Sequence, residues 1–101
     1  MILNFTTPER IKLMRESERM SRSEASKEWG LKSDALWRYE TGKAVPNIDV
    51  VTSMLNHPRF EKYALWFTTE KIAPEAGQIA PALAHFGQEN LESPPLRKNA
   101  G

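Results

Sequence analysis

Residues 21–42 read SRSEASKEWGLKSDALWRYETG, and this stretch decides the fold. Its serines indicate where a helix begins, because a serine side chain accepts a hydrogen bond from the free N–H groups of the first turn. Ser21 or Ser23 is therefore expected to cap a short helix that runs through Trp29. Gly30 ends this helix, since a chain that leaves a helix often needs a positive φ at that point.

A second short helix follows almost at once, from about Ser33 to Glu40, and Thr41 and Gly42 end it. Two short helices joined by about three residues that include a glycine form a helix-turn-helix unit. Ser26 is small at the place where the two helix axes come closest, so the helices can pack at a steep angle.

Two more helices are predicted on either side of this pair. The first is capped by Thr7 and runs to about Arg19, with Pro8 at the position where the missing N–H of proline does no harm. The next begins after Asn47. It directs three apolar side chains to the core, which are Ile48, Val51 and Leu55.

A fifth helix is expected to begin at Pro58, with His57 as its cap. Its apolar face carries residues spaced i, i+3, i+4 and i+7, which are Phe60, Tyr63, Ala64 and Phe67. A short helix is expected at residues 81–86, and residues 92–101 are expected to be disordered because they lack apolar periodicity. No stretch has the alternating pattern of a strand, so the predicted fold class is all-α.

The composition of the chain limits the kinds of function that it can have. A chain of 101 residues with 40% hydrophobic and 27% charged residues is typical of one folded domain. Without cysteine it has no thiolate catalysis and no thiolate metal site, and no cofactor is expected. His57 and His85 are far apart, and no nucleophile stands in a recognised setting, so an enzyme is not expected. No apolar run has the length of a membrane helix, and a cytoplasmic protein is expected.

The segment from Met20 to Leu31, followed by Leu36, by residues 39–43 and by Pro46, resembles the Cro/C1-type (Xre-like) helix-turn-helix family of phage repressors and small bacterial regulators. The opening serine, the glycine and the Glu-x-Gly-x-x-x-Pro string carry this resemblance. It implies a five-helix, lambda-repressor-like DNA-binding domain over residues 1–67. Residues 68–101 then form a short, partly irregular C-terminal extension.

This resemblance implies sequence-specific binding of double-stranded DNA by the helix that begins at Ser33, which enters the major groove. At 3.6 residues per turn, four side chains share its outer face and are the base-reading candidates: Ser33, Asp34, Trp37 and Arg38. Arg38 can donate two N–H groups to guanine. Asp34 can accept from cytosine or orient Arg38 one turn away. Trp37 can contact a thymine methyl group or pack against a neighbouring loop.

Two further sets of residues match family positions. The first set is expected to contact DNA phosphates and consists of Arg22, Lys32, Thr41 and Lys43. The second is the structural ion pair between Arg15 and Glu40, which is expected to be partly buried and to join the first helix to the end of the third.

The resemblance also implies a transcriptional repressor that binds a palindromic operator as a homodimer, with half-sites about 34–36 Å apart. The expected seam is the aromatic stripe of the fifth helix, because aromatic side chains are favoured in interfaces. This stripe consists of Phe60, Tyr63, Trp66 and Phe67. The alternative is that the stripe closes the core of the monomer. Residues 68–86 are expected either to extend the dimer or to cover the core.

The competing hypothesis is a protein-interaction module that recognises a toxin or an RNA polymerase subunit, with DNA binding secondary or lost. A net charge of only +1 and an outward Trp37 favour it. From Glu9 to Lys43, nine basic residues stand against seven acidic ones, a surplus of two that does not by itself predict a nucleic-acid partner.

Overall fold

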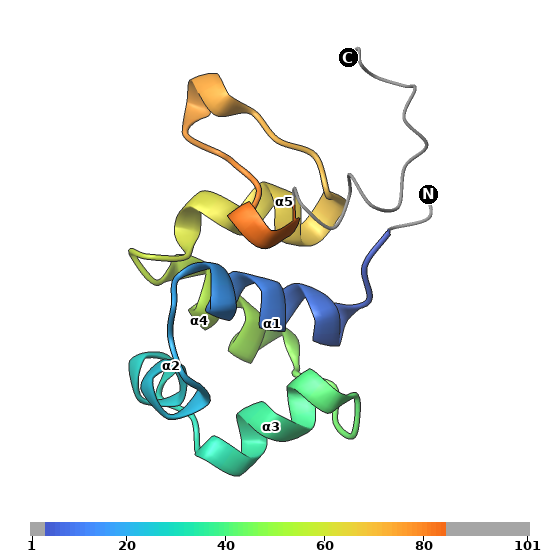
Figure 1. Ribbon diagram of the computed structural model, residues 1–101, viewed down its shortest axis with the longest axis vertical. Helices are drawn as coiled ribbons and strands as arrows, with labels where there is room; N and C mark the ends of the chain where they lie inside the picture. Colours follow the sequence, from blue (N-terminus) through green and yellow to red (C-terminus); the bar gives the residue numbers. More distant parts are fainter. Residues whose placement is uncertain (1–3, 85–101) are drawn as a thin grey trace.

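The computed structural model describes residues 4–84, in which five α-helices and two short 3-10 helices lie between residues 7 and 76 (Figure 1). In chain order these are α1 (Thr7–Ser17), α2 (Arg22–Trp29), α3 (Ser33–Thr41), α4 (Ile48–Asn56), η1 (Glu61–Tyr63), α5 (Ala64–Thr69) and η2 (Pro74–Ala76). The predicted all-α architecture of five helices is therefore confirmed. Figure 1 shows α1 across the middle of the molecule, with α2 and α3 on one side and α5 on the other.

Helix α1 begins one residue earlier than the sequence predicts. Its cap is Thr6 rather than Thr7, because Thr6 and Glu9 cap each other's backbone. The Glu9 N–H donates to Thr6 Oγ1 at 3.3 Å, and the Thr6 N–H donates to Glu9 Oε1 at 2.8 Å. The helix also ends before the predicted Arg19, which has a positive φ of 58°.

Helices α2 and α3 match the sequence prediction closely. Ser21 caps α2, since its Oγ accepts from the Glu24 N–H at 3.1 Å and Glu24 Oε1 accepts from the Ser21 N–H at 2.8 Å. The hydrogen bond from the Ser21 N–H lowers the pKa of Glu24 below its usual value. Gly30 and Gly42 follow the two helices with φ of 69° and 81°, a conformation that glycine adopts without strain.

Helix α4 begins after Asn47, as predicted, but turns a different face to the core. The Val50 N–H donates to Asn47 Oδ1 at 2.9 Å, which is the predicted cap. Ile48 was predicted to point inward, and this prediction is wrong because its side chain is 74% exposed. Met54 is buried instead, and Val50 packs against the core beside the predicted Val51 and Leu55.

The predicted fifth helix is divided into η1 and α5. Pro58 does not begin a helix, and the chain from His57 to Tyr63 makes i→i+3 bonds, such as Phe60 N to His57 O at 2.9 Å. The physical reason is the spacing of the aromatic residues. At three residues per turn, Phe60 and Tyr63 fall on one line, so the 3-10 turn directs both rings into the core, and α5 then adds Trp66 and Phe67.

The aromatic stripe lies inside the monomer. Phe60, Tyr63, Trp66 and Phe67 are all buried in the core, together with residues from α1, α2, α3 and α4. The ring of Phe60 lies 4.7 Å from that of Trp29, centre to centre. These four residues were predicted as a dimer seam, and that prediction is wrong, because a side chain without exposed surface cannot contribute area to an interface. The alternative prediction, that the stripe closes the monomer core, describes the structure.

Glu18 ties the turn after α1 to the region around η1. Its carboxylate accepts hydrogen bonds from the Tyr63 hydroxyl, from Lys62 Nζ at 2.9 Å and from Arg59 Nε at 3.2 Å. Burial alone would raise the pKa of Glu18, but these hydrogen bonds outweigh it and hold the pKa below its usual value. Burial, together with Glu18, raises the pKa of the Tyr63 hydroxyl.

The described part of the C-terminal extension covers the core. Ala80, Pro81 and Ala84 are buried, and the Ile79 N–H donates to the Lys62 carbonyl at 2.9 Å. Residues 82–84 are helical, within the predicted short helix at 81–86, whose last residues lie outside the described range, as does the predicted disordered tail. The boundary at residue 67 stays a prediction. No helix among residues 4–84 is long and apolar enough to cross a membrane.

Glu70 fastens the chain ahead of α1 to the end of α5. Glu70 follows α5 with a positive φ of 60°. Its carboxylate accepts the Asn4 N–H at 3.0 Å and the Phe5 N–H at 2.8 Å. Arg10 Nη1 lies 3.9 Å from the same carboxylate and donates to the Phe5 carbonyl at 3.0 Å. The first described residues are therefore held beside α5.

Candidate nucleic-acid interface

The outward face of α3 is the candidate interface. Leu36 is fully buried, and α3 packs against both α1 and α2. The predicted base-reading residues lie on the opposite face, and all four are exposed: Ser33, Asp34, Trp37 and Arg38. Residues 4–84 therefore leave this face open to a ligand.

Asp34 and Arg38 form an ion pair on this face. Arg38 Nη2 lies 3.1 Å from Asp34 Oδ2, and the side chains are 49% and 63% exposed, respectively. Such an exposed pair one helical turn apart adds only about 0.3–0.5 kcal/mol to stability. Its effect is on orientation, because Asp34 holds one nitrogen of the Arg38 guanidinium. Of the two roles that the sequence allows for Asp34, this contact favours the second.

Trp37 lies beside the turn that follows α3. Its side chain is 41% exposed, and Lys43 Nζ lies 5.9 Å from the centre of its ring, which is a cation–π contact. The hydroxyl of Thr41 donates to the Trp37 carbonyl at 2.8 Å. Two of the predicted phosphate-binding residues thus adjoin a predicted base-reading residue.

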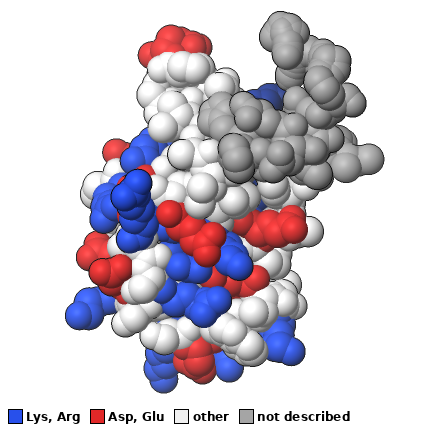
Figure 2. Space-filling model, in the orientation of Figure 1, with Lys and Arg blue, Asp and Glu red and all other residues white. Residues whose placement is uncertain are grey.

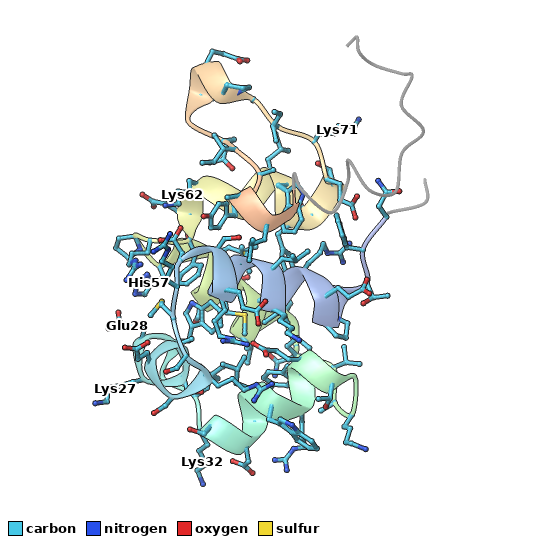
Figure 3. All side chains as sticks on the ribbon, viewed as in Figure 1. Lys27, Glu28, Lys32, His57, Lys62 and Lys71 are labelled. Carbon is cyan, nitrogen blue, oxygen red and sulfur yellow. The ribbon has the colours of Figure 1, made fainter. Side chains whose placement is uncertain are left out.

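The other predicted phosphate-binding residues lie at the opposite end of α3 and on α2. Lys32 is the residue before α3, and its exposed side chain makes no capping hydrogen bond. Figure 3 shows Lys32 at the end of the molecule, directed away from the body. Arg22 is the first residue of α2 and lies close to Glu40. Basic side chains therefore flank α3 at both ends.

The predicted ion pair between Arg15 and Glu40 is present and buried. Arg15 Nε donates to Glu40 Oε2 at 2.7 Å, and Arg15 Nη2 donates to Glu40 Oε1 at 3.0 Å. Arg15 Nη1 donates to the Met20 carbonyl at 2.8 Å. This bidentate pair fixes the end of α3 to α1 and to the start of the α2 segment, so it sets the position of the outward face.

One contact at this site escapes sequence reasoning. Arg22 Nε donates to Glu40 Oε1 at 3.1 Å, so a single carboxylate serves two guanidinium groups. The two residues lie on different helices and 18 positions apart. No periodic spacing predicts their contact, and only the packing of α2 against α3 brings them together.

The charges on this side of the molecule are mixed. Figure 2 shows basic side chains on both sides of an acidic one at the end of the molecule that α3 forms. The exposed charged residues on α3 and next to its two ends are Lys32, Asp34, Arg38 and Lys43. Three positive groups against one negative group favour an anionic partner at this end.

Comparison with known proteins assigns the region around α3 to a known protein family. Residues 9–61 match a family model described as "Helix-turn-helix domain". The chain is also 48% identical over 99 residues to "Repressor protein C" of Escherichia phage P2, and the match covers 98% of this chain and 100% of that protein. The matched family segment contains α2, α3 and α4 in full, and with them every side chain of the candidate interface.

Proposed function

Because this chain belongs to the helix-turn-helix domain family, we propose that it is a DNA-binding transcriptional repressor that places α3 in the major groove of its operator. The observation that carries the proposal is the exposure of all four outward residues of α3, which Leu36 and the Arg15–Glu40 pair brace from behind. The name of the phage P2 relative, a repressor, supports the regulatory role. Binding alone performs repression, so we assign no catalytic residue and no cofactor, and we place the protein in the cytoplasm with its operator.

In this proposal the outward residues divide into two roles. Arg38 donates to the O6 and N7 atoms of a guanine, while Asp34 keeps its guanidinium in the groove-facing orientation. Lys32 and Lys43 contact phosphates on either side of the groove and fix the register of α3. Trp37 takes part in either role, because its ring contacts a sugar of the backbone or the methyl group of a thymine base.

Replacing Arg38 with alanine is expected to remove the preference for the operator without affecting the fold. A bidentate contact to guanine supplies about 1–3 kcal/mol of discrimination, so the ratio of operator to random-duplex affinity falls by about 5–150-fold. The fold is spared because Arg38 is half exposed and its partner Asp34 is more exposed still. Titration of both duplexes, with circular dichroism as the control for folding, measures this ratio. An equal loss on both duplexes would contradict base reading by Arg38.

Replacing Lys32 with alanine is expected to weaken binding to all duplexes alike. A lost phosphate contact reduces the slope of log K against log salt by about 0.9. Lys71 is the matched control, since it is exposed and lies far from α3 (Figure 3). Lys71→Ala is expected to keep the slope of the unaltered protein. If Lys32→Ala also keeps it, Lys32 is not a phosphate contact.

The same titration on the unaltered protein tests the function itself. A DNA-binding protein loses affinity for random duplex steeply as salt rises. Binding that hardly depends on salt would instead favour the competing role as a module for a protein partner.

The homodimer and the palindromic operator stay predictions. The aromatic stripe is buried in the monomer, so a dimer would have to use another surface. Selection of bound duplexes from a random pool tests both predictions, because a two-fold symmetric dimer requires inverted half-sites. Any other arrangement of half-sites among the selected duplexes would contradict the symmetric dimer.

A further inference from the structure

We infer that Glu40 is a positioning residue for DNA binding: its buried carboxylate holds the Arg22 guanidinium in place for a phosphate contact. The inference rests on the proposed function and assigns Glu40 a second role besides the pair with Arg15. Arg22 would contact the phosphate, and Glu40 would act only through Arg22.

The first support is the way in which Glu40 is shared. Its side chain is only 1% exposed, and its Oε1 accepts from both Arg15 Nη2 at 3.0 Å and Arg22 Nε at 3.1 Å. Arg15 already balances the charge of this carboxylate through two hydrogen bonds. The three groups together therefore carry one net positive charge, and Arg22 is the member that reaches the surface.

The second support is the geometry of the Arg22 side chain. It is 40% exposed, and Nε is the atom that Glu40 binds. Within residues 4–84 the structure has no hydrogen bond from the two terminal nitrogens of Arg22. A guanidinium is planar and rigid, so a hydrogen bond at Nε also fixes the direction of these terminal nitrogens. Their N–H groups remain available to an anion.

The third support is the position of Arg22 on α2. It is the first residue of that helix, where the positive end of the helix dipole disfavours a cation and favours an anion. Without a partner, this side chain would be expected to turn away from the helix end. The bond to Glu40 keeps it there, and a phosphate bound at this end would meet both the guanidinium and the helix dipole.

Lysine in place of Arg22 separates positioning from charge. A lysine keeps the positive charge but has a single ammonium group, which cannot serve the carboxylate and a phosphate in the fixed geometry that arginine provides. If Glu40 positions Arg22, the ammonium is drawn to Glu40 and withdrawn from DNA. Arg22→Lys should then behave like Arg22→Ala.

The experiment measures the binding of random duplex DNA over a range of salt concentrations for the unaltered chain, Arg22→Ala and Arg22→Lys. Both variants are expected to lose affinity by similar factors, within about twofold of each other, and to lower the salt slope by about 0.9. Lys71→Arg is the control for the exchange of one cation for another, because Lys71 is exposed and lies far from α3, and its slope is expected to remain unchanged. Thermal unfolding confirms that each variant is folded.

Two results would overturn the inference while the proposed function stands. Arg22→Lys that keeps the affinity and slope of the unaltered chain would show that charge alone suffices. Arg22→Ala without effect would show that Arg22 makes no phosphate contact. A failure of the unaltered chain to bind duplex DNA would overturn the proposed function as well, so the two failures are distinguishable. The comparison avoids substitution of Glu40 itself, because that change also breaks its pair with Arg15.

Discussion

Replacing Glu40 with alanine is expected to lower the free energy of unfolding by about 3–5 kcal/mol. The change leaves the Arg15 guanidinium without its carboxylate. The Arg15 side chain is only 8% exposed, so little water reaches it in exchange. A buried charge without a partner is costly because the interior cannot replace the hydration it has lost. Small domains have a total stability of about 5–15 kcal/mol, so the loss is a large part of the whole. Urea unfolding followed by circular dichroism measures it.

Asp34→Ala is the control for the Glu40 substitution. It also breaks an acid–arginine pair, but both partners of that pair are largely exposed. We expect a change within about 0.5 kcal/mol, which is typical of surface substitutions. Equal losses for Glu40→Ala and Asp34→Ala would show that burial does not govern the strength of the Arg15–Glu40 pair.

Replacing Phe60 with alanine is expected to lower the free energy of unfolding by about 3–5 kcal/mol. Phe60 is fully buried, and its ring contacts the rings of Trp29, His57 and Tyr63. Its removal leaves a cavity between α2 and η1, which the surrounding rings can fill only in part. Because Phe60 supports α2 from behind, the variant is also expected to lose DNA affinity near its unfolding temperature.

Protein concentration separates a core role from a seam role for Phe60. A core residue destabilises the monomer itself, so the loss is expected to be the same at low and high protein concentration. A residue at a dimer seam would instead change how stability depends on concentration. Ile48→Ala is the control, since Ile48 is 74% exposed and its loss should change stability by less than about 0.5 kcal/mol. A loss of stability that appears only at high protein concentration would instead place Phe60 at a dimer interface.

Local chemistry explains why the α2–α3 region could be predicted. The hydrogen bonds of Ser21 and the positive φ of Gly30 and Gly42 involve only neighbouring residues, so the sequence contains the whole of each signal. The outward face of α3 follows from the helical period once the ends of the helix are known. For this reason the candidate interface was the most predictable part of the molecule.

The aromatic stripe shows what an apolar pattern leaves open. The spacing of Phe60, Tyr63 and Phe67 indicates a buried face, but it does not indicate whether the same chain or a second copy covers it. The packing of Trp29 against Phe60 decides the matter, and that contact joins residues 31 positions apart. The pattern also assumes 3.6 residues per turn, so it does not reveal the 3-10 turn, which has three.

The contact of Arg22 with Glu40 and the contacts of Glu18 were unpredictable for a related reason, whereas the family resemblance implied the pair of Arg15 with Glu40. These contacts join segments that are far apart in the sequence: Glu40 accepts from Arg22 on α2, and Glu18 accepts from η1 and the turn that precedes it. The charge pattern along the chain shows that enough basic residues exist to pair with them. It does not show which ones, because pairing depends on how the helices cross.

The hold of Glu70 on the amides of Asn4 and Phe5 bears on how the protein can be handled. The backbone enters the folded body beside the end of α5, on the side of α1 that faces away from α3 (Figure 1). A fluorophore, purification tag or surface tether joined ahead of these residues would consequently be attached nearer to α5 than to α3. A chip or a microscope slide could thus carry the protein with the outward face of α3 left open to the solution.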